Sequence, residues 1–258
     1  MRDLALVLRQ VRFTNKTFWR NPASALFTLG FPLMFLVIFT ALLGSGDVEV
    51  TNGVFINLSS YYVAAMAAFS VITACYTNLA ISVTFQRDLG ILKRTRGTPL
   101  PSWAYLSGRV VHAIFVAVLL VVLTAAFGAI VYGADIPHGL QLARFGAVVL
   151  VGALTFAALG LASTAIVPNA EAAPAVVNTI ILPLLFLSGI FIPIEANAPE
   201  WVRVVGSWFP VRHFTEAMLA GFYGAPFAFD WSDVLVLAAW GLVGLVIGVR
   251  VFRWEPRR

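Results

Sequence analysis

The sequence predicts an all-α membrane protein with six transmembrane helices. Of its 258 residues, 60% are hydrophobic and only 11% are charged, whereas a typical soluble domain is roughly 45–50% apolar and about 25% charged. Long apolar runs recur along the chain, and basic residues gather between alternate runs. This composition excludes water-soluble globular proteins, which could not cover their surface with polar groups. It also excludes disordered chains, which have little apolar surface to bury.

Residues 1–22 are expected to form an amphipathic helix that lies in the membrane interface. At about 100° per residue, apolar side chains fill one arc of this helix and basic side chains fill the adjoining arc. The apolar members are Leu4, Val7, Leu8, Val11, Phe18 and Trp19, and the basic members are Arg2, Arg9, Arg12, Lys16 and Arg20. A disordered basic leader is the alternative interpretation.

Six apolar runs are long enough to cross a bilayer, which takes about 20 residues. None has an ionisable Asp, Glu, Lys or Arg in its middle. They cover residues 24–43, 58–84, 110–133, 145–167, 172–194 and 234–250. A further stretch at 211–229 is fairly apolar, but the part after Glu216 is too short to span, and we expect a surface or re-entrant helix there.

The basic residues predict the orientation of these spans. All but three of the 17 Lys and Arg residues lie before the first span, in the loop 85–109, or after the last span. Loops rich in Lys and Arg stay in the cytoplasm, so both termini are expected to be cytoplasmic. The net charge of +5 therefore favours membrane lipids as a partner and not nucleic acid.

Two segments between spans are long enough to carry function. The cytoplasmic loop 85–109 is expected to hold a short helix from Arg87 to about Thr95, which Gly97 would end. Two interpretations of this segment remain open: it is a solvated basic loop, or it is a docking site for a cytoplasmic partner protein. The external segment 195–233 is expected to form short helices, one of which begins after Pro199.

Several motifs resemble the ABC type 2 permeases, a family that includes daunorubicin-resistance-type drug exporters and exporters of polysaccharides or lipid carriers. The motifs are PLLFLSGIFIPIE at 183–195, PEW at 199–201, FPVRHFTEA at 209–217, and RDLGILKR at 87–94 followed by TPL at 98–100. The resemblance covers essentially the whole chain, so residues 1–258 are expected to form one transmembrane domain. Asp88 departs from the family, which more often has Glu there.

The resemblance implies the transmembrane subunit of an ATP-driven exporter in the bacterial inner membrane. Such a subunit pairs with a second copy or a paralogue, and a separate cytoplasmic ATPase binds the ATP and Mg²⁺. Its contact with the ATPase would be made by Arg87, Asp88, Gly90, Leu92, Arg94, Thr98 and Pro99. The sequence itself has no G-x-x-x-x-G-K-[ST] phosphate loop, so this chain is not expected to hydrolyse ATP or to bind a cofactor.

An aromatic stripe marks a candidate translocation path. Tyr62, Met66, Phe69, Thr73 and Tyr76 recur at i, i+4, i+7, i+11 and i+14, a spacing that places them on one face of a regular helix. Together with Phe186 and Phe191 they could stack against a flat amphiphilic substrate. They could equally well pack against other helices or against lipid.

Other classes of function remain open on the sequence alone. His112, His138 and His213 are too scattered to indicate a metal site, and no catalytic arrangement is evident. A channel or a secondary transporter that works without an ATPase is the main alternative, although the spans lack the intramembrane acid that ion coupling uses. A scaffold protein is a third. The substrate could be a hydrophobic drug, a lipid or a lipid-linked glycan.

Overall fold

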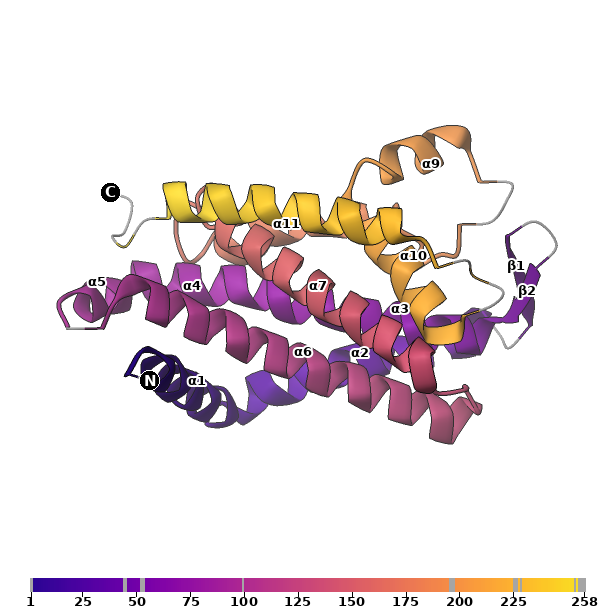
Figure 1. Ribbon diagram of the computed structural model, residues 1–258, viewed down its shortest axis with the longest axis horizontal. Helices are drawn as coiled ribbons and strands as arrows, with labels where there is room; N and C mark the ends of the chain where they lie inside the picture. Colours follow the sequence, from indigo (N-terminus) through magenta and orange to yellow (C-terminus); the bar gives the residue numbers. More distant parts are fainter. Residues whose placement is uncertain are drawn as a thin grey trace.

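The computed structural model describes residues 2–43, 46–51, 54–98, 100–194, 198–224, 227, 229–252 and 254. The chain is a bundle of helices with one small hairpin (Figure 1). In order, the elements are α1 (Arg2–Trp19), α2 (Pro22–Leu43), β1 (Asp47–Thr51), β2 (Val54–Asn57), α3 (Leu58–Ile72), the π-helical turn η1 (Thr73–Thr77), α4 (Asn78–Asp88), α5 (Ile91–Arg96), α6 (Ser102–Tyr132), α7 (Gly139–Ser163), α8 (Ala173–Phe186), α9 (Glu200–Gly206), α10 (Pro210–Tyr223) and α11 (Trp231–Val251).

Five helices in the described part of the chain are long and apolar enough to cross a membrane. They are Ala25–Leu43, the continuous Leu58–Asp88, Ser102–Tyr132, Gly139–Ser163 and Trp231–Val251. The predicted fifth span, 172–194, is not one long helix. Only α8 is helical there, and its 14 residues span about 21 Å at 1.5 Å per residue, less than the roughly 30 Å hydrocarbon core. The chain leaves the helix after Phe186 and turns at Gly189, whose φ is +85°.

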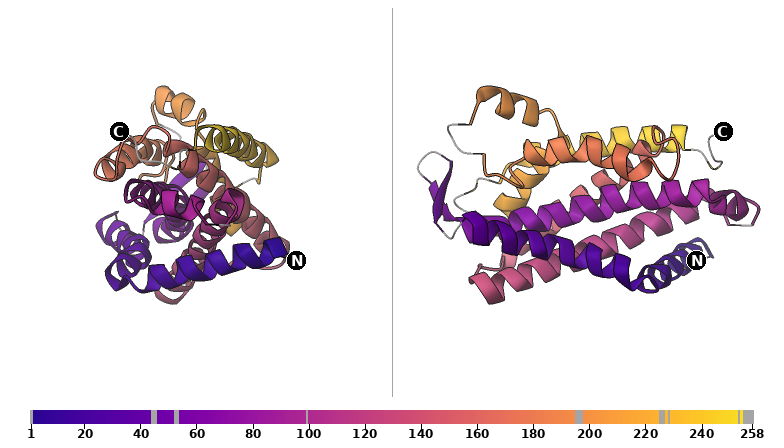
Figure 2. Two further views of the ribbon diagram at one scale, coloured as in Figure 1. Left: turned by 90° about the vertical axis from the view of Figure 1, so that its left-hand side faces the viewer. Right: turned by 180° about the vertical axis from the view of Figure 1, so that it is seen from behind.

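The long helices run side by side, and the chain segments at the two ends of the bundle differ. At one end lie α1, α5 and the C-terminal end of α11 (Figures 1 and 2). There the ring of Trp254, just after α11, lies 5.8 Å from the ring of Tyr105 near the start of α6. The hairpin and α9 lie at the opposite end. The N-terminal and C-terminal segments therefore lie at the same end of the bundle, as the charge pattern predicts.

The core is built around α3, which the neighbouring helices surround. Its side chains from Tyr61 to Ile72 are buried, and it packs against α2, α6, α7 and α10. By contrast, α2 and α11 have long apolar runs that are mostly exposed. A soluble protein would not leave such surfaces open, so they suit contact with lipid or with a second membrane subunit.

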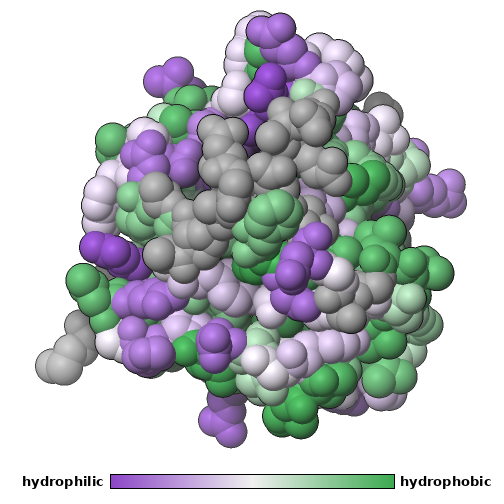
Figure 3. All heavy atoms as spheres, turned by 90° about the vertical axis from the view of Figure 1, so that its right-hand side faces the viewer, coloured by the Kyte–Doolittle hydropathy of each residue, from purple (hydrophilic) through white to green (hydrophobic). Residues whose placement is uncertain are grey.

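Two features differ from the sequence prediction at the end that carries the hairpin. The antiparallel pair of β1 and β2, with Val48 opposite Ile56, was not expected, although Asn52-Gly53 between the strands is a typical hairpin sequence. For the segment 211–229 the surface-helix alternative is wrong, because α10 is buried among α3, α7 and α11; the re-entrant alternative stays a prediction. Seen from this end, hydrophilic residues spread over the face and hydrophobic residues are densest along one margin (Figure 3).

The N-terminal segment is helical, and it packs along α6. A Cβ on Gly108 of α6 would lie 2.6 Å from Cγ of Gln10, so glycine is needed for the close approach of the two helices. The predicted apolar arc of α1 is divided. Phe18 contacts the ring of His112 on α6, whereas Leu4 and Leu8 are exposed.

Candidate functional site

The end of α4 is attached to the turn that follows α7. Arg87 is 2% exposed and donates hydrogen bonds from Nη1 to the Thr164 carbonyl oxygen at 2.8 Å and from Nη2 to that of Val167 at 2.7 Å. Asp88 accepts a hydrogen bond of 2.9 Å from the Ala170 amide. Carbonyl groups at the end of a helix lack intrahelical partners, and Arg87 supplies them with charged donors. These bonds of Arg87 and Asp88 hold the turn after α7 against the end of α4.

Beyond Asp88 the chain forms a projecting tip, which we define as residues 89–98. The helix begins at Ile91 and not at Arg87, because Gly90 has a φ of +69°, a left-handed conformation that interrupts the helix and favours glycine. Leu92 is fully buried and holds α5 against the bundle, whereas Leu89 is 62% exposed. The other exposed side chains of the tip are Ile91, Lys93, Arg94, Arg96 and Thr98, and Pro99 lies outside the described residues.

The predicted aromatic stripe is buried, and it does not stay on one face. Tyr62, Met66 and Phe69 are 3% exposed or less. Tyr62 stacks on Phe39 with ring centroids 5.2 Å apart. The π-helical turn then changes the direction of the residues after it, because its wider hydrogen-bonding pattern includes one more residue than an α-turn. The amide of Asn78 accordingly bonds to the carbonyl of Thr73.

Tyr76 consequently lines a separate apolar pocket. This pocket, of about 230 Å³, lies between η1, α7, α8, α10 and α11, and its other walls include Phe156, Ile181 and Trp240. The backbone of α7 comes close to η1 here: a Cβ on Gly160 would lie 2.9 Å from the carbonyl oxygen of Tyr76. The regular spacing of the stripe in the sequence did not indicate that Tyr76 lies apart from Tyr62, Met66 and Phe69.

The two remaining path candidates lie after the stripe in sequence, and they differ in exposure. Phe191 is buried against Phe35, Phe39 and Phe69. Phe186 lies 5.0 Å from Phe191, measured between ring centroids, and is 54% exposed. Phe186 is therefore the candidate aromatic that a substrate could reach most directly.

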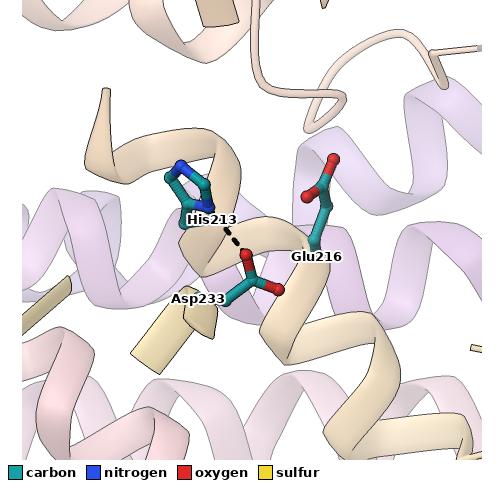
Figure 4. Close-up of side chains that lie close together, drawn as sticks. All are labelled: His213, Glu216 and Asp233. Carbon is teal, nitrogen blue, oxygen red and sulfur yellow. Dashed lines mark hydrogen bonds and ion pairs between the residues drawn. The ribbon is translucent and has the colours of Figure 1, made fainter. Parts of the chain in front are cut away.

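At the opposite end, His213, Glu216 and Asp233 bring their polar atoms within 4.8 Å of one another (Figure 4). Nδ1 of His213 lies 2.6 Å from Asp233 Oδ1, and Nε2 lies 2.8 Å from the Ser207 carbonyl oxygen. Glu216 accepts a hydrogen bond of 2.7 Å from Arg212. Since both ring nitrogens already have partners, this cluster connects α10 to the start of α11 as a polar network. The spacing of the three residues in sequence did not indicate it.

The start of α11 is capped beside this network. Asp230 accepts a 2.6 Å hydrogen bond from the Ser232 hydroxyl and a 2.8 Å hydrogen bond from the Ser232 amide. These bonds to the Ser232 hydroxyl and amide hold the pKa of Asp230 below its usual range. The cap satisfies an amide that has no partner within the helix.

Comparison with known protein families decides the assignment of this bundle. Residues 5–223 match the family described as ABC-2 type transporter. The chain belongs to this family. It is therefore a multi-pass membrane permease, a subunit that lacks ATPase activity, and ABC-2 permeases work with a partner ATPase that binds the ATP.

Two curated relatives are similar to this ABC-2 permease. "Putative transport permease YvfS" of Bacillus subtilis (strain 168) is 26% identical over 242 residues, which cover 91% of each chain. "Probable multidrug ABC transporter permease YbhR" of Escherichia coli (strain K12) is 28% identical over 137 residues, which cover 53% of this chain and 36% of the relative. The second similarity thus spans about a third of that relative's length.

Proposed function

We propose that this chain is the membrane subunit of an exporter that moves a hydrophobic drug, a lipid or a lipid-linked glycan out of the cell. Family membership and the exposed tip at residues 89–98 carry the proposal. The name of the Escherichia coli relative favours a drug as the first substrate class to test. We infer that both termini and the tip lie in the cytoplasm; this is supported by their common end of the bundle and by the basic residues gathered there.

The tip is proposed as the docking surface for the ATPase. Its exposed apolar side chains, Leu89 and Ile91, can enter a hydrophobic groove, and Lys93, Arg94 and Arg96 beside them can pair with acidic residues of the partner. The bonds of Arg87 and Asp88 to the turn after α7 support a route by which movement of the tip reaches α7 and α8.

The translocation path is proposed to lie where two permease subunits meet, either two copies or this chain and a paralogue. The mostly exposed apolar runs of α2 and α11 give each subunit surface for such contact. Phe186 supplies an aromatic side chain at the surface, and Tyr76 lines an apolar pocket behind it. Tyr62, Met66, Phe69 and Phe191 support these groups by packing.

Export is tested with the permease purified together with its partner ATPase. ATP hydrolysis is measured in lipid vesicles while hydrophobic cations, phospholipids and lipid-linked glycans are added in turn. One class should stimulate hydrolysis and accumulate on the side away from ATP. Transport by the permease alone, with no ATPase present, would favour a channel or secondary transporter instead.

Docking is tested with Leu89→Asp and Ile91→Asp together, which place charge on the apolar part of the tip. Recovery of the ATPase on the purified permease should fall at least tenfold. Leu140→Asp, an exposed apolar residue at the other end of α7, is the matched control and should leave recovery unchanged. Equal recovery with both variants would remove the tip from the docking surface.

A further inference from the structure

A second pocket, of about 220 Å³, lies where α1 and α2 meet η1, α4 and α6. Part of its wall is apolar and includes Phe18 and Val116. The rest is polar and includes Asn78 and Ser82. The transport path and the coupling tip described above use neither this pocket nor its two basic residues, Arg109 and His112.

Arg109 is buried in this pocket, and none of the described residues places a counter-charge beside it there. Its residue is 8% exposed, and Nη2 donates a hydrogen bond of 2.5 Å to the Ser82 hydroxyl. Its Nε has no hydrogen-bond partner within the described part of the chain, and no carboxylate lines the pocket. A buried guanidinium is strongly unfavourable unless an anion and further acceptors satisfy it.

His112 lies one turn along α6 and adds a further polar side chain to this pocket. It is also 8% exposed, and its Nδ1 has no hydrogen-bond partner among the residues that the structure describes. Phe18 of α1 packs against its ring at 5.7 Å between centroids. Residues three apart lie on the same face of a helix, so Arg109 and His112 line the same wall.

The position of the pocket indicates which anion it meets. Arg109 lies two turns inside α6, which begins at Ser102, and this is about 10 Å along the axis at 1.5 Å per residue. The pocket also adjoins the end of α1, the helix proposed to lie in the interface. An interfacial α1 would bring the pocket to the depth of the lipid phosphate groups, and basic pockets between transmembrane helices bind such headgroups.

We propose that this pocket binds the phosphate group of an anionic phospholipid. Arg109 provides the positive charge, and its guanidinium group suits the geometry of phosphate oxygens. Arg109 and His112 together provide the hydrogen-bond donors. The apolar wall at Phe18 and Val116 contacts the glycerol and the first part of the acyl chains. The assignment of this lipid to the cytoplasmic leaflet rests on the proposed orientation of the chain. The proposal that the pocket binds the lipid does not depend on that orientation.

The test measures lipid binding to the purified full chain by native mass spectrometry in detergent. Phosphatidylglycerol is compared with diacylglycerol of the same acyl chains, which lacks the phosphate. The wild-type chain should retain one phosphatidylglycerol at concentrations at least tenfold below those needed for diacylglycerol. Equal retention of the two lipids would overturn the proposal without any variant, so it can be tested even if the variants fold poorly.

Variants then locate the site. Arg109→Gln and His112→Gln should each weaken the retention of phosphatidylglycerol, Arg109→Gln by about tenfold, which corresponds to 1.4 kcal/mol. Arg12→Gln is the matched control: it removes an exposed charge of α1 and should change retention by less than about twofold, because exposed single charges contribute little. Unchanged binding by Arg109→Gln, or an equal loss in Arg12→Gln, would show that lipids bind only to the basic surface.

A third arm separates a lipid from free phosphate. Inorganic phosphate added to the wild-type chain should displace phosphatidylglycerol only weakly, because it lacks the apolar part. Its binding to the wild-type chain at the affinity of the lipid, with loss of that binding in Arg109→Gln, would make a soluble phosphate compound the ligand and overturn the assignment to a lipid.

Discussion

The hydroxyl of Tyr62 donates a hydrogen bond of 2.9 Å to the carbonyl oxygen of Phe191. This bond joins α3 to the segment after α8, where the chain has left its helix and has no neighbouring turn to satisfy its carbonyl groups. The neighbouring Tyr61 makes the same kind of contact with the Gly189 carbonyl at 2.7 Å. The irregular segment is thus supported by side chains of the most buried helix.

Tyr62→Phe should therefore lower the stability of the protein by about 1–3 kcal/mol, because it leaves the Phe191 carbonyl buried without its partner. The measurement is the melting temperature of the purified chain in detergent. Tyr132→Phe is the matched control, since its hydroxyl has no hydrogen bond with the described residues, and its effect should stay within about 0.5 kcal/mol. Equal melting temperatures for the two variants would contradict the importance of this bond.

Phe69→Ala and Phe186→Ala should separate packing from transport. Phe69 is 3% exposed, so its truncation should cost about 3–5 kcal/mol of stability. Phe186 is 54% exposed, so its truncation should leave the melting temperature nearly unchanged. If Phe186 meets the substrate, half-saturation of substrate-stimulated ATP hydrolysis should rise roughly fivefold or more in Phe186→Ala, since an aromatic contact is worth about 1 kcal/mol or more. An unchanged half-saturation would exclude Phe186 from the path.

Arg87→Ala should destabilise the protein by about 3 kcal/mol or more, because it removes two charged hydrogen bonds to buried carbonyl groups. Arg94→Ala, on the exposed tip, should change stability by less than about 0.5 kcal/mol but should weaken association with the ATPase. Thermal unfolding and ATPase recovery are measured on both variants. A stable Arg87→Ala protein with poor ATPase recovery would instead make Arg87 part of the docking surface.

Gly90→Ala should cost about 1–2 kcal/mol, because alanine is disfavoured at a φ of +69°. A Cβ there meets open space, so strain of the backbone is the cause and not a clash. Gly146→Ala in α7 also places its Cβ in open space, but within an ordinary helix, where it should stabilise by about 0.5–1 kcal/mol. Opposite shifts of the melting temperature are expected, and shifts of the same sign would contradict this account.

Cysteine labelling tests the orientation. In a Cys75→Ala background, Asp135→Cys and Trp201→Cys should react with an impermeant thiol reagent added outside intact cells, because their residues are exposed at the end proposed to face outward. Thr98→Cys on the tip should react only after the cells are opened. The reverse pattern of labelling would show that the basic end of the bundle faces outward.

The features that sequence predicted well are those set by local composition. Apolar length and basic loops located five of the six spans, the common side of both ends of the chain and the helix at the N-terminus. The helix 172–194 was predicted too long, because hydropathy does not register that Gly189 adopts a left-handed conformation and that Ile190 and Phe191 turn back into the core.

The candidate site was harder to predict, since it depends on contacts distant in sequence. Nothing near Arg87 indicates that its partners are carbonyl groups 77 and 80 residues away, so its burial could not be predicted from the sequence. The geometry of the aromatic stripe was hard to predict for another reason. Its spacing assumes a regular helix, and the π-helical turn interrupts that periodicity between Phe69 and Tyr76.

That single wide turn sets the rotational phase of everything after it in the helix. If residues 73–77 were all kept but wound as an ordinary α-helix, α4 would be turned by about 100° around its own axis. Arg87 would then point away from the carbonyl of Thr164, and Asp88 away from the amide of Ala170. The angular alignment between the membrane-spanning helix and the turn after α7 is thus encoded by one extra residue, ten positions or more before the side chains that depend on it.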